Sequence, residues 1–148
     1  MEKVTINKSI RLSEHITLGE VTKSSHAEIN NIPSHVAIEN LKRVCIWLEV
    51  LRGRMGPIII NSGYRSPELN KKVGGSPTSN HLTGCAVDIR VAGIEQALRY
   101  AVILMDYADE TQQDYDELLI ERSAKGNYWV HLAVRPKENR RKTTFIIK

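Results

Sequence analysis

Apolar residues recur at three- and four-residue steps in two long stretches of the chain, a spacing typical of amphipathic helices. The first stretch follows Ser34, which can cap a helix, and continues to about Gly53. Its apolar stripe consists of Ile38, Leu41, Val44, Cys45, Leu48 and Leu51. The second stretch, over 94–108, carries Ile94, Ala97, Leu98, Ala101, Met105 and Ala108. We therefore predict two long helices, each with one face turned to a core.

Shorter runs alternate between apolar and polar residues or are rich in β-branched ones, and such runs predict strands. We expect strands over 57–61, 86–91, 117–121 and 128–134, and a last edge strand over 143–147. The six residues 122–127 suit a hairpin turn, which would pair Glu121 with Tyr128. The order of these elements indicates an α+β fold with a mainly antiparallel sheet packed against helices.

Three shorter segments complete the prediction. Residues 1–16 are expected to be extended, and Thr17 with Glu20 matches a capping box, which predicts a short helix to about Ser24. Ser66 and Pro67 begin another short helix, to about Val73, because proline suits the first helical position. The residues 74–79 between that helix and the next strand form a loop.

Composition narrows the class of protein. The chain has 148 residues, of which 41% are hydrophobic, and we expect one domain over 1–148 that acts as a monomer. The formal net charge is +4, and much of the excess lies in a basic C-terminal tail, 135–148. This tail is interpreted as a solvated face or as an attraction for an anionic partner. The two cysteines, Cys45 and Cys85, are expected to be reduced thiols.

Three side chains have the chemistry of a metal site. His81 precedes a predicted strand, Asp88 lies in it, and His131 lies in another. Imidazole and carboxylate groups can hold a zinc ion with one position left open. Neighbouring strands are about 4.8 Å apart, so side chains from two of them can meet around one ion. The spacing alone also fits a core histidine and a carboxylate that bonds a backbone turn.

The residues around these three resemble the M15 family of zinc D-alanyl-D-alanine peptidases. The family's Ser-x-His-x-x-Gly-x-Ala-x-Asp motif is filled by Ser79, His81, Gly84, Ala86 and Asp88, and its closing Trp-x-His is similar to Trp129-Val130-His131. The stretches 60–66, 69–70 and 73–80 resemble the family as well. The resemblance covers roughly 12–134 and looks most like the phage-type, endolysin-like branch.

This resemblance implies a Hedgehog/D-Ala-D-Ala-peptidase-like fold and a Zn²⁺ ion bound by His81, Asp88 and His131. It implies that Arg65 faces the substrate, where its guanidinium would bind a carboxylate or stabilise an oxyanion. Ser79 and Trp129 are expected to contact the same substrate. That substrate would be a peptide of bacterial peptidoglycan, cut by a D-Ala-D-Ala carboxypeptidase or an endolysin-type endopeptidase activity.

The general base is not indicated by the same motif. Several members of the family carry a glutamate three residues before the last ligand, whereas this chain has Tyr128 there. Glu121 lies in a segment that looks like the Asp-Gln-Leu-Ile-x-Glu strand of the branch, and we expect it to act instead. Asp116 and Glu117 are the alternative candidates for the base. Glu121 is also compatible with a purely structural role, as an exposed charge on a strand.

Other function classes are compatible with parts of the sequence. A non-catalytic, zinc-containing wall-binding or phage structural module would explain Tyr128. A nucleic-acid binder would use the basic tail, but aromatic and basic residues do not interleave there, so we expect no nucleic-acid partner. No stretch resembles a signal peptide or a membrane span, which leads us to expect cytoplasmic synthesis, no membrane partner, and action at the cell wall after release by another route.

Overall fold

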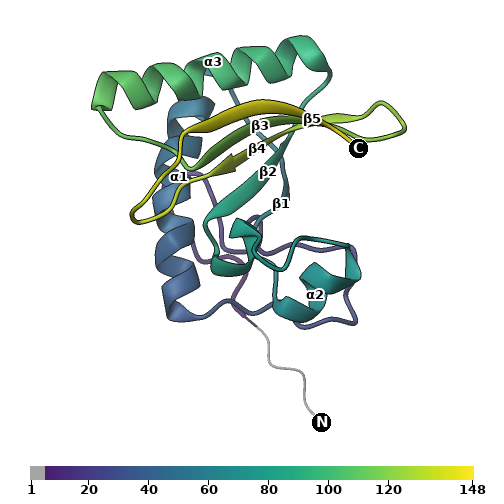
Figure 1. Ribbon diagram of the computed structural model, residues 1–148. Coiled ribbons are helices and arrows are strands. Elements are labelled where there is room, and N and C mark those ends of the chain that lie inside the picture. The colour runs from purple at the N-terminus through teal and green to yellow at the C-terminus, as the bar shows by residue number, and fades with distance from the viewer. Residues whose placement is uncertain (1–5) are drawn as a thin grey trace.

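The computed structural model describes residues 6–148 (Figure 1). The start of the expected extended N-terminal segment, 1–5, lies outside the described residues. Within them, five strands form one sheet: β1 (Ile60–Ser62), β2 (Ala86–Arg90), β3 (Glu117–Arg122), β4 (Tyr128–Ala133) and β5 (Lys142–Ile147). Their order in space is β1-β2-β4-β3-β5. The pairs β1–β2, β2–β4 and β3–β4 are antiparallel, and β5 runs parallel to β3. The predicted α+β fold with a mainly antiparallel sheet is confirmed.

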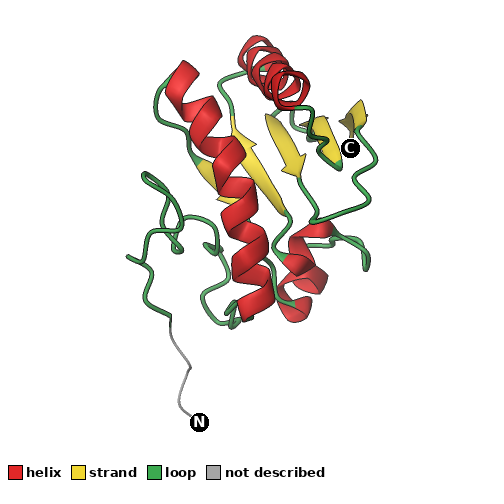
Figure 2. Cartoon of the chain, turned by 90° about the vertical axis from the view of Figure 1, so that its left-hand side faces the viewer, coloured by secondary structure: helices red, strands yellow, loops and turns green. Residues whose placement is uncertain are grey.

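The long helices lie where the apolar stripes predict them. They are α1 (His35–Met55) and α3 (Ile94–Thr111), and both pack on one face of the sheet (Figures 1 and 2). Ser34 caps α1, since its side chain accepts a hydrogen bond from the Ala37 amide at 3.1 Å. The short helix α2 (Pro67–Lys72) is capped in the same way by Ser66 and contacts the 3₁₀ turn η1 (Asn80–Thr83).

Alternation along the strands divides the sheet into two chemically different faces. The face toward α1 and α3 is apolar and buried, and its strand residues are Val87, Ile89, Leu118, Ile120, Val130 and Leu132. Trp47 and Leu48 of α1 and Leu104 of α3 pack into the same core. The opposite face carries Asp88, Glu117, Glu121 and His131. Helices therefore cover one face, and the polar face remains available for a site.

The expected helix from Thr17 to Ser24 is wrong, because Thr17 forms an isolated bridge with Arg11, 18–22 form turns and 23–24 have no regular structure. The capping-box bonds do form: the Thr17 amide donates to Glu20 Oε1 at 3.2 Å, and the Glu20 amide donates to Thr17 Oγ1 at 3.3 Å. The neighbouring backbone groups, however, bond to other segments. The Gly19 amide donates to Lys8 O, and Val21 O accepts from the Tyr64 amide. Tertiary partners replace the bonds through which a helix would continue.

The predicted hairpin register is also wrong by one residue. Glu121 pairs with Trp129, and Arg122 pairs with Tyr128, so the loop is 123–127. The Ser123 amide closes it by donating to Asn127 O at 2.9 Å. A slip of one residue turns a strand's side chains to the other face of the sheet. The observed register puts Glu121 on the same face as His131.

The basic C-terminal tail belongs partly to the sheet. Residues 142–147 form the edge strand β5, close to the predicted 143–147. Arg135 and Arg140, whose side chains are 33% and 51% exposed, form ion pairs with the fully buried Asp116, at 3.2 and 2.9 Å. The tail stays largely exposed, and these two side chains in addition bond to a buried carboxylate. Cys45 and Cys85 are buried free thiols. In the described part of the chain, no helix has the length and apolarity needed to cross a membrane.

Candidate metal centre

Local structure accounts for the position of each candidate ligand. Asp88 on β2 lies directly opposite His131 on β4, so both side chains project from the polar face. His81 approaches from η1, whose first amides are capped by Ser79: its hydroxyl accepts from the His81 amide at 3.1 Å. Gly84 ends η1 in the left-handed region, with φ 76°, and a Cβ there would lie 2.4 Å from Ala37 O. The motif serine and glycine thus form the turn that carries His81.

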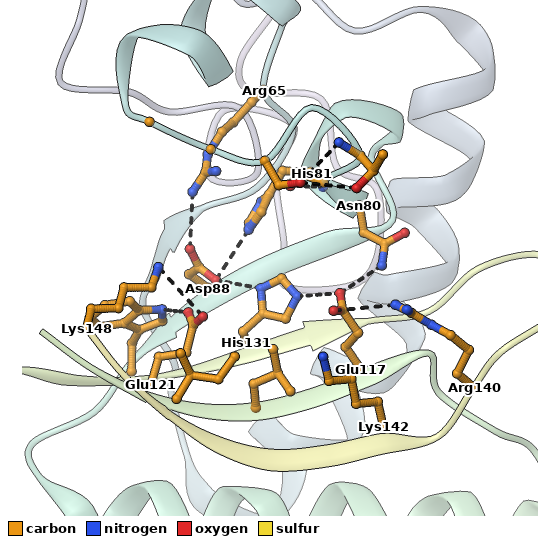
Figure 3. Close-up of a pocket in the computed structure, with 18 of the residues that line it drawn as sticks. Arg65, Asn80, His81, Asp88, Glu117, Glu121, His131, Arg140, Lys142 and Lys148 are labelled. Atoms are coloured by element: carbon orange, nitrogen blue, oxygen red, sulfur yellow. Dashed lines mark hydrogen bonds and ion pairs between the residues drawn. The ribbon is translucent and has the colours of Figure 1, made fainter.

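The three side chains converge. One ligand atom from each of His81, Asp88 and His131 lies within 4.8 Å of the other two, and all three residues are buried (Figure 3). Asp88 Oδ1 lies 3.4 Å from His81 Nε2 and 3.0 Å from His131 Nδ1. Among the residues that the structure describes, this is the group of histidine, cysteine and carboxylate side chains close enough to share an ion.

The second nitrogen of each imidazole is held by an acceptor. His81 Nδ1 lies 2.7 Å from the Gly63 carbonyl oxygen, which can only accept, so Nδ1 carries the proton. His131 Nε2 lies 3.0 Å from Glu117 Oε1. Each ring therefore turns its other nitrogen, Nε2 of His81 and Nδ1 of His131, toward Asp88. Such outer hydrogen bonds fix the ring orientation and tautomer of histidine ligands.

This donor set fits a zinc ion. Two imidazole nitrogens and one carboxylate oxygen, with a fourth position facing a cleft, are the ligands of catalytic zinc sites. Burial alone would raise the pKa of Asp88, but His81 and His131 outweigh it and hold that pKa well below its ordinary value. Burial also opposes protonation of His131, yet hydrogen bonds to Asp88 and Glu117 raise its pKa to about 10. The electrostatic environment between Asp88 and Glu117 therefore stabilises a positive charge, and a bound divalent cation would supply such a charge.

The predicted site residues line one cleft on the polar face, with a volume of about 600 Å³. Besides the three ligand candidates, its wall includes Arg65, Ser79, Glu117, Glu121 and Trp129. Basic side chains form much of the rest: Arg135, Arg140, Lys142 and Lys148. The fold thus brings together in one cavity residues that are far apart in the sequence.

Arg65 is held beside the ligands by three contacts. Its Nη2 lies 3.5 Å from Asp88 Oδ2, its Nε donates to Ser62 Oγ at 3.2 Å, and its Nη1 donates to Asn70 Oδ1 at 3.3 Å. Asn70 is buried and fixed in turn, since its Nδ2 donates to Ser76 O at 2.9 Å. The guanidinium is therefore oriented before any substrate arrives. Asn70 lies in a stretch that resembles the family, but the resemblance implied no role for it.

Glu121 and Glu117 lie on opposite sides of the His131 ring (Figure 3). Glu121 is on the side of Asp88 and of the ring nitrogen Nδ1. The residue is 8% exposed, its carboxylate accepts a hydrogen bond from Trp129 Nε1, and Lys148 Nζ lies 3.8 Å from Oε1. Glu117 is bonded to the ring's other nitrogen. The two carboxylates consequently have different surroundings although they share a strand.

The carboxylate of Asp116 is held by hydrogen bonds and ion pairs with neighbouring side chains. Burial would raise its pKa, but Arg140 and Asn80 outweigh burial and lower that pKa to about 2. The hydrogen bond from His131, opposed by burial, lowers the pKa of Glu117 to about 2. Asn80 Nδ2 lies 2.8 Å from Asp116 Oδ2 and 2.8 Å from Glu117 Oε1. Asn80 could have been singled out from the sequence as a residue of the site, because it stands next to His81 in the motif. Arg140 had no such signal beyond the basic composition of the tail.

Comparison with known proteins agrees with this geometry. A family model described as Peptidase M15 matches residues 14–132. That stretch contains the three candidate ligands as well as Arg65 and Glu121, and it ends before Arg135. No curated protein matches the chain.

Proposed function

Since the chain belongs to the peptidase M15 family, we propose that it is a zinc-dependent hydrolase that cuts a peptide bond in the stem or cross-link peptides of bacterial peptidoglycan. The observation that carries this proposal is the convergence of His81, Asp88 and His131 within 4.8 Å in an open cleft. The wall would be reached after release of the protein, as in a phage-type lytic system.

In this proposal the three side chains hold zinc through His81 Nε2, His131 Nδ1 and the Asp88 carboxylate. Bound zinc supplies Lewis acidity, which polarises the scissile carbonyl and makes water acidic near neutral pH. The outer hydrogen bonds to Gly63 O and Glu117 keep both imidazoles in the tautomer that binds a metal. The protein's other groups bind the peptide and move protons.

We assign the proton transfers to Glu121. It shares the face of His131 and lies on the side of that ring that carries Nδ1, whereas Glu117 is bonded behind the ring and Asp116 is held by Arg140. Trp129 Nε1 donates to Oε2 of Glu121, and we assign the proton of the attacking water to Oε1, which Lys148 Nζ approaches only to 3.8 Å. The resulting carboxylic acid then donates that proton to the leaving amine.

Arg65, Ser79 and Trp129 are proposed to bind the peptide. The guanidinium of Arg65 presents a fixed pair of donors that suits a substrate carboxylate or the oxyanion formed at the scissile carbonyl. Ser79 and Trp129 line the same cleft as the ligand candidates. Whether a carboxypeptidase or an endopeptidase reaction takes place depends on how the peptide runs through this cleft.

The test is hydrolysis of purified peptidoglycan by the zinc-loaded protein. We expect free amines to be released, and mass spectrometry of the muropeptides would identify the bond. Glu121→Gln should lower turnover by about 100-fold or more, because a general base contributes roughly that factor, while zinc content stays unchanged. The matched control is Glu95→Gln, which alters an exposed carboxylate on α3 that is paired with Arg99. Unchanged turnover in Glu121→Gln would exclude Glu121 as the base.

The second candidate function is a non-catalytic zinc module that binds the wall or serves in a phage structure. It is favoured by the surroundings of Glu121, whose carboxylate is already contacted by Trp129 and Lys148. Wild-type protein that carries one zinc ion, binds peptidoglycan and releases no amine would support this candidate and contradict the proposed hydrolase.

A further inference from the structure

The non-ligating nitrogen of His131 is bonded to a carboxylate from the neighbouring strand. Glu117 lies on β3 opposite Ala133, one pleat from Leu119, which is the residue opposite His131. Its side chain reaches along the sheet, and Oε1 lies 3.0 Å from His131 Nε2. An ionised carboxylate only accepts hydrogen bonds, so this contact requires the proton on Nε2. Nδ1 makes an equivalent contact with Asp88 Oδ1, at 3.0 Å, but Asp88 is itself a candidate ligand, so a zinc ion held between them would take the place of the proton on Nδ1.

Glu117 is itself held in place by two donors. Asn80 Nδ2 donates to Oε1 at 2.8 Å, and Arg140 Nη2 lies 3.5 Å from Oε2. Asn80 is buried, adjacent to the ligand His81, and its own Oδ1 accepts from Arg135 Nε at 2.9 Å. One network of bonds therefore runs from the turn that carries His81 to the carboxylate that orients His131.

The arginines of this network come from the segment between β4 and β5, beyond the residues that the family model matches. Arg140 is anchored at Asp116 by three bonds, from its amide at 3.1 Å, Nε at 3.0 Å and Nη2 at 2.9 Å. That anchor fixes the guanidinium next to Glu117 (Figure 3). The C-terminal segment therefore reaches the metal centre and does not merely follow it in the chain.

We propose that Glu117 and Arg140 are positioning residues of the metal centre: Glu117 selects Nδ1 of His131 as the ligating atom, and Arg140 holds Glu117 for that purpose. This inference rests on the proposed zinc site. It assigns a role in metal binding to the C-terminal segment.

The test is the zinc dissociation constant, measured by competition with a chromophoric chelator and without substrate. Glu117→Ala should weaken zinc binding about 10- to 100-fold, the usual effect of losing an outer partner of a histidine ligand. Glu117→Gln keeps an acceptor for Nε2 and should retain part of that affinity. Arg140→Ala should weaken binding less than Glu117→Ala does. Glu95→Ala and Arg99→Ala, which alter an exposed pair on α3, serve as matched controls and should bind zinc as the wild type does.

A second measurement does not depend on how well the variants fold. Nitrogen chemical shifts of His131 in the zinc-loaded wild type should show a proton on Nε2 and the metal on Nδ1. The reverse arrangement would overturn the proposal, as would wild-type zinc affinity in Glu117→Ala. Tight zinc binding without hydrolysis would contradict the proposed function alone, and hydrolysis with unchanged zinc affinity in Glu117→Ala would contradict this inference alone.

Discussion

Close contacts around Arg65 explain why glycine is needed at position 75, although Gly75 has no side chain that could act in the site. Gly75 packs against the side chain that orients Arg65: a Cβ at this position would lie 2.0 Å from Asn70 Oδ1 and 3.0 Å from Arg65 Nη1. Asn70 also accepts from the Gly75 amide through its backbone oxygen at 2.8 Å. The glycine is required by the space that Asn70 and Arg65 occupy, and this requirement arises only after the loop has folded onto α2.

We predict that Gly75→Ala displaces the guanidinium and lowers kcat/KM about 10- to 100-fold, because small misplacements of a binding group cost factors of this size. Zinc content should not change, since the atoms nearest to an added Cβ at Gly75 belong to Asn70 and Arg65 and not to a candidate ligand. Steady-state kinetics and metal analysis of the purified variant would measure both. Gly53→Ala, at which nothing lies within 4 Å of an added Cβ, should keep wild-type kinetics. Equal kcat/KM in Gly75→Ala and wild type would contradict the role given to Asn70.

The elements differ in how far their own sequence determines them. The α1 stripe, the Ser34 cap and the Gly56 end are local signals, and the helix follows them within about two residues of the predicted end. The segment from Thr17 has an equally good local signal but forms turns, because its backbone groups bond to Lys8 and Tyr64. Long periodic segments bury a whole face against the sheet, whereas a one-turn segment follows whichever partners the fold offers.

Two glycines near the end of α1 should respond oppositely to the same substitution. Gly53 is helical and exposed, so Gly53→Ala should raise the free energy of unfolding by about 0.5–1 kcal/mol through helix propensity. Gly56 ends the helix at φ 84° and bonds Arg52 O, so Gly56→Ala should lower it by on the order of 1 kcal/mol. Urea unfolding of both variants measures the difference. The same sign for both substitutions would contradict this account.

At the scale of the whole molecule, Asp116 links the start of β3 to the C-terminal segment. Burial opposes its ionisation, but Arg140, Asn80 and Arg135 lower its pKa from 3.8 to about 2. A carboxylate with a lowered pKa in the folded state stabilises that state above its unfolded pKa, and the contribution is lost as the pH falls toward the folded pKa. The shift corresponds to on the order of 2 kcal/mol.

Asp116→Asn should therefore lower the free energy of unfolding at pH 7, and the gap to wild type should narrow as the pH falls from about 4 to about 2. Denaturant unfolding at a series of pH values would measure the gap. Asp106→Asn, an exposed carboxylate on α3, is the matched control and should leave stability nearly unchanged. A gap that stays constant down to pH 2 would mean that Asp116 contributes by its shape and not by its charge.

The long helices, most of the strands, the α+β class and the ligand candidates could be predicted from the sequence alone, because these depend on periodicity and on residue type at short range. Tertiary structure decided which side of His131 each carboxylate occupies. The predicted hairpin register was one residue off, and such a slip exchanges the faces of the sheet. Only the folded chain distinguishes Glu121, on the side of Nδ1 that we propose binds zinc, from Glu117 on the side of Nε2. It also brings Arg140 to the site from a segment with no local signal, since a contact between distant residues is set by packing and not by either residue's neighbours in the sequence.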